Sequence, residues 1–207
     1  MKLTLQHLQR KLLNGGEVVK EQAEKSFNTL LDQVDTLNDI ATSFSAFAKM
    51  PIPKEEVFDI GAVLKKNIEL YSNDNEVEIL TDIPPGDFFV KGDQQLMSRI
   101  FTNLILNGIQ SVPAGRKPEI SVSLQKNIHF IRVEIHDNGM GISETIRNKI
   151  FIPNFSTKYA GSGIGLALAK RGVEHAGGKI WFETEEEQGT SFFIELPLLP
   201  YLEIVNA

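Results

Sequence analysis

Two closely spaced prolines divide the sequence into parts with different hydrophobic patterns. Pro51 and Pro53 lie in the run MPIPKEE. Neither proline can donate a backbone amide hydrogen, and each biases the residue before it toward an extended conformation. A helix that comes before them must therefore end here. We expect a domain boundary at this point, with residues 1–50 on one side and 51–207 on the other.

The first part carries apolar residues at the alternating spacing of three and four that is typical of a coiled coil. The two apolar rows are separated by Asn14, Gly15 and Gly16, which suit a helix end and a turn. The pattern predicts a helical hairpin over 1–50. A two-helix hairpin cannot bury its apolar stripe alone, so we expect a homodimer in which two hairpins form a four-helix bundle. Packing of the hairpin on the rest of its own chain is the alternative. The rows are Leu5, Leu8 and Leu12, and then Phe27, Leu30, Val34, Leu37, Ala41, Phe44 and Ala48.

The second part mixes helical and strand-like patterns. Residues 59–73 and 93–112 have helical periodicity, and five other segments are rich in the β-branched and aromatic residues that strands favour. Strands follow one another without a helix between each pair. This order favours an α+β fold, with helices layered on a sheet, over a doubly wound parallel sheet. The predicted strands are 77–83, 119–125, 129–136, 178–184 and 190–196.

The composition limits the partners that this chain can have. Its net charge of −6 and pI near 5.3 argue against binding to nucleic acid or to acidic lipid, which would require a basic surface. The absence of cysteine excludes disulfides and cysteine-ligated zinc. No apolar run is long enough to cross a bilayer, so we expect no membrane contact. The first residues are already in amphipathic register without a capping signal, which suggests a fragment of a longer protein.

Two asparagines lie one turn apart in the predicted helix of 93–112, which Asp93 can cap. Asparagine is a poor helix former, so Asn103 and Asn107 on one helix face suggest a function. Their side-chain oxygens could ligate a hard cation such as Mg²⁺. The alternative is a pair of exposed or locally hydrogen-bonded amides.

Two glycine-rich segments flank a short aromatic stretch. DNGMGI at 137–142 follows a predicted strand, and a second segment from Gly161 leads into an apolar helical run. Backbone amides at a helix N-terminus can bind phosphate, although turns and helix ends need glycine as well. The spacing fits neither the Walker nor the Rossmann fingerprint, so a different nucleotide site is required. Between the two segments, IFIPNFSTK at 150–158 either closes over phosphates or is a plain loop.

Taken in order, these segments resemble the sequence boxes of sensor histidine kinases. NLILNGIQS at 103–111 is similar to the N box, DNGMGI to the G1 box, IFIPNFSTK to the F box, and GSGIGL at 161–166 to the G2 box. Over about residues 56–199 the chain resembles the ATP-binding domain of the GHKL superfamily. The resemblance implies a two-layer α/β sandwich, in which an antiparallel-rich sheet is layered against helices. Residues 1–50 resemble the dimerisation and histidine-phosphotransfer hairpin, most closely that of the nitrogen-regulation type.

The resemblance implies how the base of ATP would be bound. Asp137 would accept a hydrogen bond from the exocyclic amine of adenine. Gly139 and Gly141 would let the backbone approach the nucleotide. Thr190 resembles the residue that helps to hold adenine through water.

The resemblance also implies how Mg²⁺ and the phosphates would be bound. Asn107 matches the amide that ligates Mg²⁺, and Asn103 lies near the same face. Gly108 replaces the usual alanine of the N box, at a cost of about 1 kcal/mol in helix stability. The short lid would be 159–162. The residues that would contact the phosphates are Lys158, Gly161, Ser162, Gly163, Ile164, Gly165 and Leu166.

Position 103 distinguishes members of the superfamily. Gyrase-like, chaperone and mismatch-repair ATPases have a glutamate there, which activates water, whereas the amide of Asn103 cannot take a proton at neutral pH. We therefore expect transfer of the ATP γ-phosphate to a protein histidine, and then to an aspartate in the receiver domain of a response regulator. The alternative is a non-catalytic nucleotide-binding and dimerisation module that regulates a partner. An anti-sigma or serine-kinase relative would not need the heptad hairpin.

The phosphoacceptor of such a kinase is missing. No segment matches the pattern H-E-[IL]-[RK]-N-P, and His7 is followed by LQRK without an adjacent acid. We expect His7 on the exposed side of a helix, and His129, His136 and His175 in structural roles. The sequence therefore predicts a kinase core that binds ATP but does not phosphorylate itself. We expect a cytoplasmic location for it, whether or not the full-length protein is anchored in a membrane.

Overall fold

The computed structural model describes residues 27, 53–72, 76–158 and 163–199. The chain divides into two compact units, Met1–Lys49 with Ser156–Ser162, and Met50–Phe155 with Gly163–Ala207. The fold described below is that of the larger unit. The predicted hairpin, its dimer seam and the boundary near residue 50 lie outside the described residues, apart from the exposed Phe27, and they stay predictions.

A mixed five-stranded sheet forms the larger unit, with the strand order β2-β4-β5-β7-β6. β2 runs parallel to β4, and every other neighbouring pair is antiparallel. All five predicted strands are therefore confirmed. The strands are β2 (Glu78–Asp82), β4 (Glu119–Lys126), β5 (Phe130–Asp137), β6 (Lys179–Glu185) and β7 (Gly189–Pro197).

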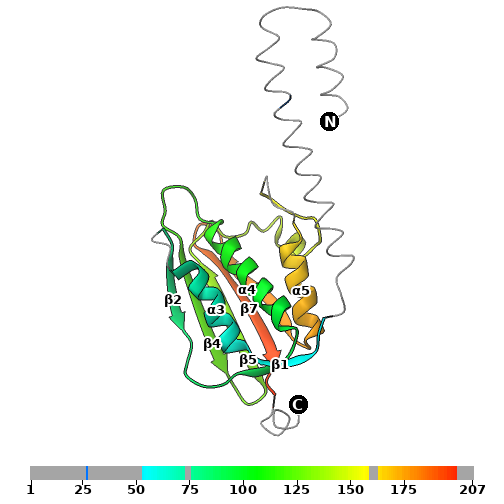
Figure 1. The fold of residues 1–207 in the computed structure, drawn as a ribbon. Helices are drawn as coiled ribbons and strands as arrows, with labels where there is room; N and C mark the ends of the chain where they lie inside the picture. Colours follow the sequence, from blue (N-terminus) through cyan, green and yellow to red (C-terminus); the bar gives the residue numbers. More distant parts are fainter. Residues whose placement is uncertain (1–26, 28–52, 73–75, 159–162, 200–207) are drawn as a thin grey trace, which may run out of the picture. The chain divides into compact units, whose positions relative to one another are not determined.

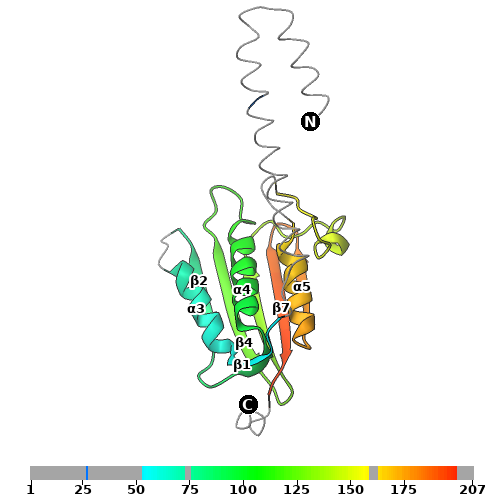
Figure 2. The same cartoon turned by 45° about the vertical axis from the view of Figure 1, so that its right-hand side comes forward.

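Three helices cover one face of this sheet, with α4 between α3 and α5 (Figures 1 and 2). The helices are α3 (Ile60–Ser72), α4 (Gln94–Ile109) and α5 (Gly165–His175). The helix layer on an antiparallel-rich sheet confirms the predicted α+β fold, a two-layer α/β sandwich. No helix in the described ranges is both long and apolar enough to cross a membrane.

Helix α4 forms where the sequence predicts it. Asp93 caps the helix, because its side chain accepts a hydrogen bond of 2.8 Å from the amide of Leu96. Ile100 and Leu104 are buried in the core, as expected. The helix ends at Ile109 rather than at residue 112. The stripe of buried residues fixes which side of α4 faces the sheet.

Strand β5 sets the position of the acidic residue that follows it. Ile131, Val133 and Ile135 alternate into the core, because successive side chains of a strand point to opposite faces. Asp137 continues this series and therefore lies on the helix-covered face of the sheet. His136 lies on the opposite, outer face.

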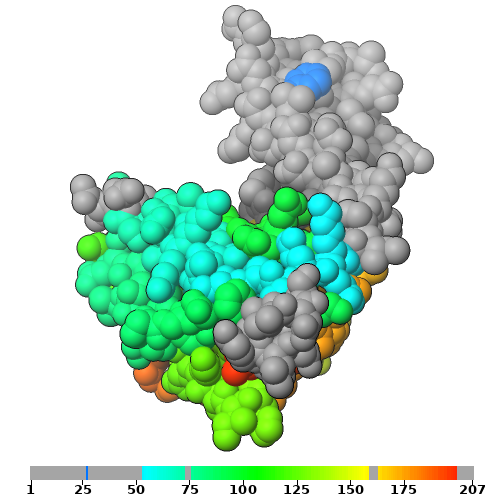
Figure 3. Space-filling view, turned by 60° about the horizontal axis from the view of Figure 1, so that its bottom comes forward, coloured from blue at the N-terminus to red at the C-terminus, as the bar shows by residue number. Residues whose placement is uncertain are grey.

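Two short strands were not predicted from the sequence. β1 (Glu56–Asp59) and β3 (Phe89–Gly92) pair as an antiparallel ribbon, and Figure 3 brings the end of the unit with β1 (cyan) forward. Each strand has four residues, which is too few for alternation to be recognised. As a result, Asp59, which we predicted to begin a helix, ends β1, and α3 starts one residue later. A 3-10 helix, η1 (Arg147–Lys149), is the other unpredicted element.

Candidate functional site

Asp137 is a buried carboxyl group, with only 4% of the residue exposed. Its Oδ1 accepts hydrogen bonds from Ser111 Oγ at 2.8 Å and from the amide of Gly139 at 2.9 Å. Burial raises the pKa of this carboxyl group, and the hydrogen bonds from Ser111 and Gly139 oppose that rise. None of the ion pairs among the described residues involves Asp137. A buried acid without a cationic partner is costly to the fold, and such groups often mark functional sites.

The glycines after Asp137 are required by close contacts within the protein. A Cβ at Gly139 would overlap Ser111 Oγ and would lie 2.6 Å from Asp137 Oδ1. Gly141 has a φ of 70°, and a Cβ there would overlap the carbonyl oxygen of Glu185. The family resemblance implies that these glycines allow the close approach of a nucleotide. The fold also requires glycine at both positions, because protein atoms occupy the space that a side chain would take.

Thr190 lies next to Asp137 in the sheet. The two residues are paired in the β5–β7 ladder, and Thr190 is 3% exposed. The hydroxyl oxygen of Thr190 is 3.0 Å from that of Thr184. Thr184 Oγ1 also accepts a hydrogen bond of 2.9 Å from the amide of Ile142, at the end of the glycine loop. A small cluster of hydroxyl groups therefore connects β6, β7 and the loop beside Asp137.

Asn103 lies where α5 approaches α4. A Cβ at Gly165, the first residue of α5, would overlap the Asn103 side-chain amide, so the two helices are in close contact here. Asn103 Nδ2 is buried and has no hydrogen-bond partner within the described part of the chain. Leaving a buried donor unpaired costs about 1–3 kcal/mol. This amide fits the expectation that an external group binds nearby.

Gly108 brings the end of α4 against Asp137. A Cβ at Gly108 would lie 3.0 Å from the Cβ of Asp137 and 2.9 Å from Ile120 Cδ1. The helix therefore gains close packing from a residue that lowers its intrinsic stability. Asn107 is the preceding residue and is half-buried. Helix α4 thus contacts the start of α5 at Asn103 and Asp137 at Gly108, the residue that follows Asn107.

The start of α5 is the predicted phosphate-binding segment. The N-cap residue is Ile164, whose side chain makes no capping hydrogen bond, and the backbone amides of the first turn suit an anion. Gly163 has a φ of 66° and packs against the backbone of Asn154 and Phe155. Ile164 is buried and Leu166 is half-buried, so only their backbone groups suit a phosphate.

The rest of the predicted phosphate site is not described together with these residues. Lys158 is exposed and belongs to the other compact unit. Gly161, Ser162 and the predicted lid lie outside the described residues. Their contribution to the site stays a prediction.

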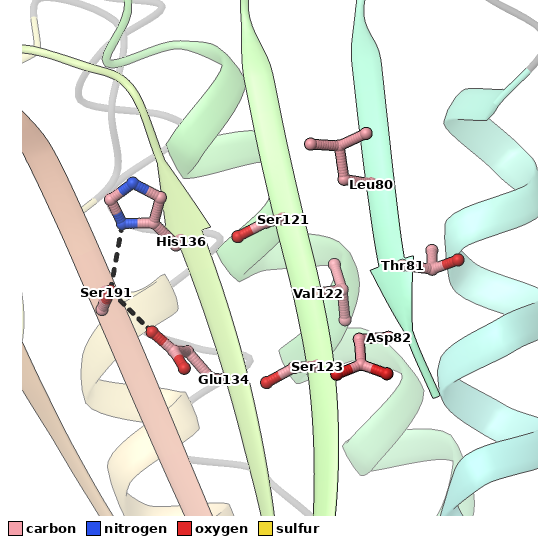
Figure 4. A pocket seen from close by; sticks show the side chains of 9 residues that line it. All are labelled: Leu80, Thr81, Asp82, Ser121, Val122, Ser123, Glu134, His136 and Ser191. Atoms are coloured by element: carbon pink, nitrogen blue, oxygen red, sulfur yellow. Dashed lines mark hydrogen bonds between the residues drawn. The ribbon is translucent and has the colours of Figure 1, made fainter. Parts of the chain in front are cut away.

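The outer face of the sheet carries a separate polar network, in a shallow hollow of about 500 Å³ (Figure 4). His136 Nδ1 lies 3.0 Å from Ser191 Oγ, which donates a hydrogen bond of 2.9 Å to Glu134. None of the predicted site residues lines this hollow. His136 is thus close to Asp137 in sequence but faces away from it, which fits the structural role expected for it.

Sequence reasoning missed two residues of the candidate site, Ser111 and Thr184. Both carry hydroxyl groups that bond to the segment from Asp137 to Ile142. Ser111 falls inside the N-box segment, but its spacing there indicates no role. Its contact depends on where α4 ends, and that of Thr184 depends on the pairing of β6 with β7. No local sequence pattern reveals either feature.

The sandwich and the site define a class of ATP-binding domain that comparison with known proteins identifies. Residues 92–200 match the family described as histidine kinase-, DNA gyrase B-, and HSP90-like ATPase, which is more than half of the chain. The chain therefore belongs to this family. Sporulation kinase B of Bacillus subtilis (strain 168) is 32% identical over 190 residues, covering 90% of this chain and 44% of that protein. The chain thus spans less than half of this relative.

Solved structures agree with this family. The catalytic domain of histidine kinase ThkA superposes with a TM-score of 0.63 at 26% identity, covering 71% of this chain and 99% of that chain. A second ThkA structure, in complex with response regulator protein TrrA, has a TM-score of 0.67 at 22% identity, covering 96% of this chain and 57% of that chain. Because its sequence identity is only 22%, the second match supports the fold alone. The domain is therefore of the sensor histidine kinase type, as predicted, whereas the nitrogen-regulation subtype stays a prediction.

Proposed function

We propose that this chain is the ATP-binding catalytic core of a two-component sensor histidine kinase. ATP binds between α4, the loop of 137–142 and the start of α5. The γ-phosphate passes to a histidine outside this chain, and from there to an aspartate of a response regulator. The observation that carries the proposal is the buried carboxyl group of Asp137 beside α4. On this helix, the buried side-chain nitrogen of Asn103 has no hydrogen-bond partner among the residues that the structure describes.

Base recognition follows from the charge of Asp137. A carboxylate accepts hydrogen bonds only, so it suits the amino group of adenine and disfavours the carbonyl oxygen that guanine has at the same position. Burial strengthens such a bond, because the site has a lower effective dielectric than water. Thr190, paired with Asp137 in the sheet and bonded to Thr184, is proposed to help hold adenine through water.

Phosphate binding follows from the two helix segments. Asn107 supplies an amide oxygen of the kind that Mg²⁺ accepts, and the uncapped start of α5 supplies backbone amides for phosphate oxygens. Mg²⁺, when bound, would neutralise charge on the phosphates. Phosphoryl transfer depends mainly on positioning and charge neutralisation, which are the contributions proposed for these groups. Lys158 and the loop residues 161–166 are proposed to complete the site.

The choice of a protein rather than water as the phosphate acceptor follows from Asn103. Its amide cannot remove a proton from water at neutral pH, so hydrolysis lacks a base and a protein acceptor is favoured. The complex of histidine kinase ThkA with response regulator protein TrrA supports a response regulator as the partner of this class of kinase.

We further propose that the chain is cytoplasmic and forms a homodimer through residues 1–50. The second candidate function is a regulatory module that binds ATP without transfer; the absence of an H-box pattern from this sequence fits both candidates.

Phosphotransfer to a separately supplied acceptor tests this function. The chain is mixed with labelled ATP, Mg²⁺ and a helical hairpin that carries an H box, and the control is the same hairpin with glutamine in place of the acceptor histidine. Label on the first hairpin alone supports the kinase. ATP binding without transfer supports the regulatory module, and a chain that binds no ATP contradicts both.

A further inference from the structure

We propose that Ser111 is a positioning residue for adenine recognition, whose hydroxyl group holds the carboxylate of Asp137 in the orientation that accepts from the base. This inference rests on the proposed function. It assigns a specificity role to a residue at the end of the helix that carries Asn107.

Ser111 connects α4 to the loop after β5 by backbone and side-chain bonds. Its carbonyl oxygen accepts a hydrogen bond of 3.1 Å from the amide of Met140, and its own amide donates one of 3.0 Å to the carbonyl oxygen of Gly108. Its hydroxyl group bonds to Asp137 at 2.8 Å. The residue therefore links the helix of the two asparagines to the loop that starts with Asp137.

The Ser111 hydroxyl group lies between two acceptors. Its oxygen is 2.8 Å from Asp137 Oδ1 and 2.7 Å from the carbonyl oxygen of Gly108. A hydroxyl group has one hydrogen, and a bond to an ionised acceptor is about twice as strong as a neutral one. The hydrogen therefore points to Asp137 when its carboxyl group is charged. The Gly108 carbonyl oxygen keeps the bond from the Ser111 amide.

Ser111 and Gly139 bond to the same oxygen atom of the carboxylate. Ser111 Oγ and the amide of Gly139 each donate to Asp137 Oδ1, so neither uses Oδ2. Two donors on one oxygen restrict the torsion of the short side chain, and we assign the other oxygen, Oδ2, to the ligand. The fit is tight, because Ser111 Oγ occupies the place where a Cβ of residue 139 would stand.

The Ser111 bond also affects the charge of the site. Burial raises the pKa of Asp137, and the hydrogen bond from Ser111 is the largest of the effects that lower it. Without this bond the carboxyl group would hold its proton to a higher pH, and only the amide of Gly139 would still donate to Oδ1. A ligand that reads Asp137 would then lose affinity, whereas a ligand that cannot donate to Asp137 would be affected much less.

The test compares two nucleotides that differ at the atom facing Asp137. ADP carries an amino group on the base, and inosine diphosphate carries a carbonyl oxygen there. Titration calorimetry of the full chain and of Ser111→Ala measures both affinities. We expect Ser111→Ala to weaken ADP binding about tenfold, the loss typical of a hydrogen bond to a charged group, and to leave inosine diphosphate unchanged.

Ser98→Ala is the matched control, because Ser98 lies in the same helix and bonds to the buried Asn67 at 3.1 Å, away from the site. It should change neither affinity. Equal losses for both nucleotides in Ser111→Ala would mean a general structural role and would overturn the proposal, as would unchanged ADP binding. If the parent chain binds neither nucleotide, the proposed function itself is wrong and this inference falls with it.

Discussion

When no nucleotide is bound, the buried carboxyl group of Asp137 lowers the stability of the folded state. Its pKa is raised chiefly by burial, so the folded state disfavours the charged form. A carboxyl group of this kind favours folding below its unfolded pKa, which is about 3.9, and that contribution is lost as the pH rises through the higher folded value. A ligand that donates a hydrogen bond to the carboxylate offsets the cost of burying its charge. The carboxyl group that destabilises the empty site is therefore the one that is proposed to bind the ligand.

The first prediction concerns this pH dependence. In nucleotide-free protein, the free energy of unfolding of Asp137→Asn relative to the parent should increase between about pH 3 and pH 7, because asparagine carries no charge to be buried. Urea unfolding at both pH values measures the difference. Asp82→Asn, at an exposed site, is the control and should show no such trend. A relative stability of Asp137→Asn that falls with pH would contradict the assigned burial effect.

At the scale of single residues, the sequence predicted the chemistry of the site better than its contacts. The spacing of Asn103 and Asn107 and the family resemblance of Asp137 predicted these residues, and the fold places Asp137 against Gly108 of the helix that carries both asparagines. Ser111 and Thr184 were missed because their roles depend on the end of a helix and on the pairing of two strands. Such contacts are long-range, and residue type carries no signal for them.

At the scale of elements, alternation and helical period predicted the long strands and helices, because one face of each is buried. The same logic could not find β1 and β3, since four residues give too little alternation. The parallel pairing of β2 with β4 was also beyond local patterns, because β3 and α4 lie between the two strands in the sequence.

The second prediction concerns the pairing of β5, β6 and β7 on the outer face. Glu195 lies 2.9 Å from Arg132 and 2.7 Å from Lys179, so one carboxylate bridges three strands. Burial raises the pKa of Glu195, but the hydrogen bonds from Lys179 and Arg132 outweigh it and hold the pKa below its ordinary value. The bridge therefore stabilises the fold above the unfolded pKa of glutamate, and this contribution is lost as the pH falls through the lower folded value.

Glu195→Gln should reduce the free energy of unfolding at pH 7 by about 1–3 kcal/mol, with little effect at about pH 3. Urea unfolding at the two pH values is the measurement. Glu55→Gln is the control, because Glu55 pairs with Lys91 at 2.7 Å on an exposed surface, where ion pairs contribute little. Equal effects of the two substitutions at pH 7 would show that the bridge adds nothing beyond a surface pair.

At the scale of the whole molecule, the chain contains a complete sandwich but less than half of sporulation kinase B. We propose that the sandwich binds the nucleotide, whereas transfer needs an acceptor histidine segment that this sequence does not contain. The proposed dimer belongs to residues 1–50, which lie almost entirely outside the described residues.

The third prediction concerns this dimer. Analytical ultracentrifugation of the parent chain should give a dimer, and Leu37→Asp should give a monomer, because a charge in the apolar seam cannot be buried without a partner. Gln33→Asp is the control, since it adds the same charge outside the heptad row and should leave the dimer intact. A monomeric parent chain would reject the four-helix bundle.

In the proposed site, Asp137 binds the base and Asn107 binds the metal ion of the same nucleotide. Calorimetric titration of ATP, with and without Mg²⁺, tests this in the parent chain, Asp137→Asn and Asn107→Ala. We predict that Asp137→Asn weakens binding under both conditions, whereas Asn107→Ala removes only the gain from Mg²⁺. Unchanged ATP affinity in Asp137→Asn, or full Mg²⁺ dependence in Asn107→Ala, would contradict the shared site.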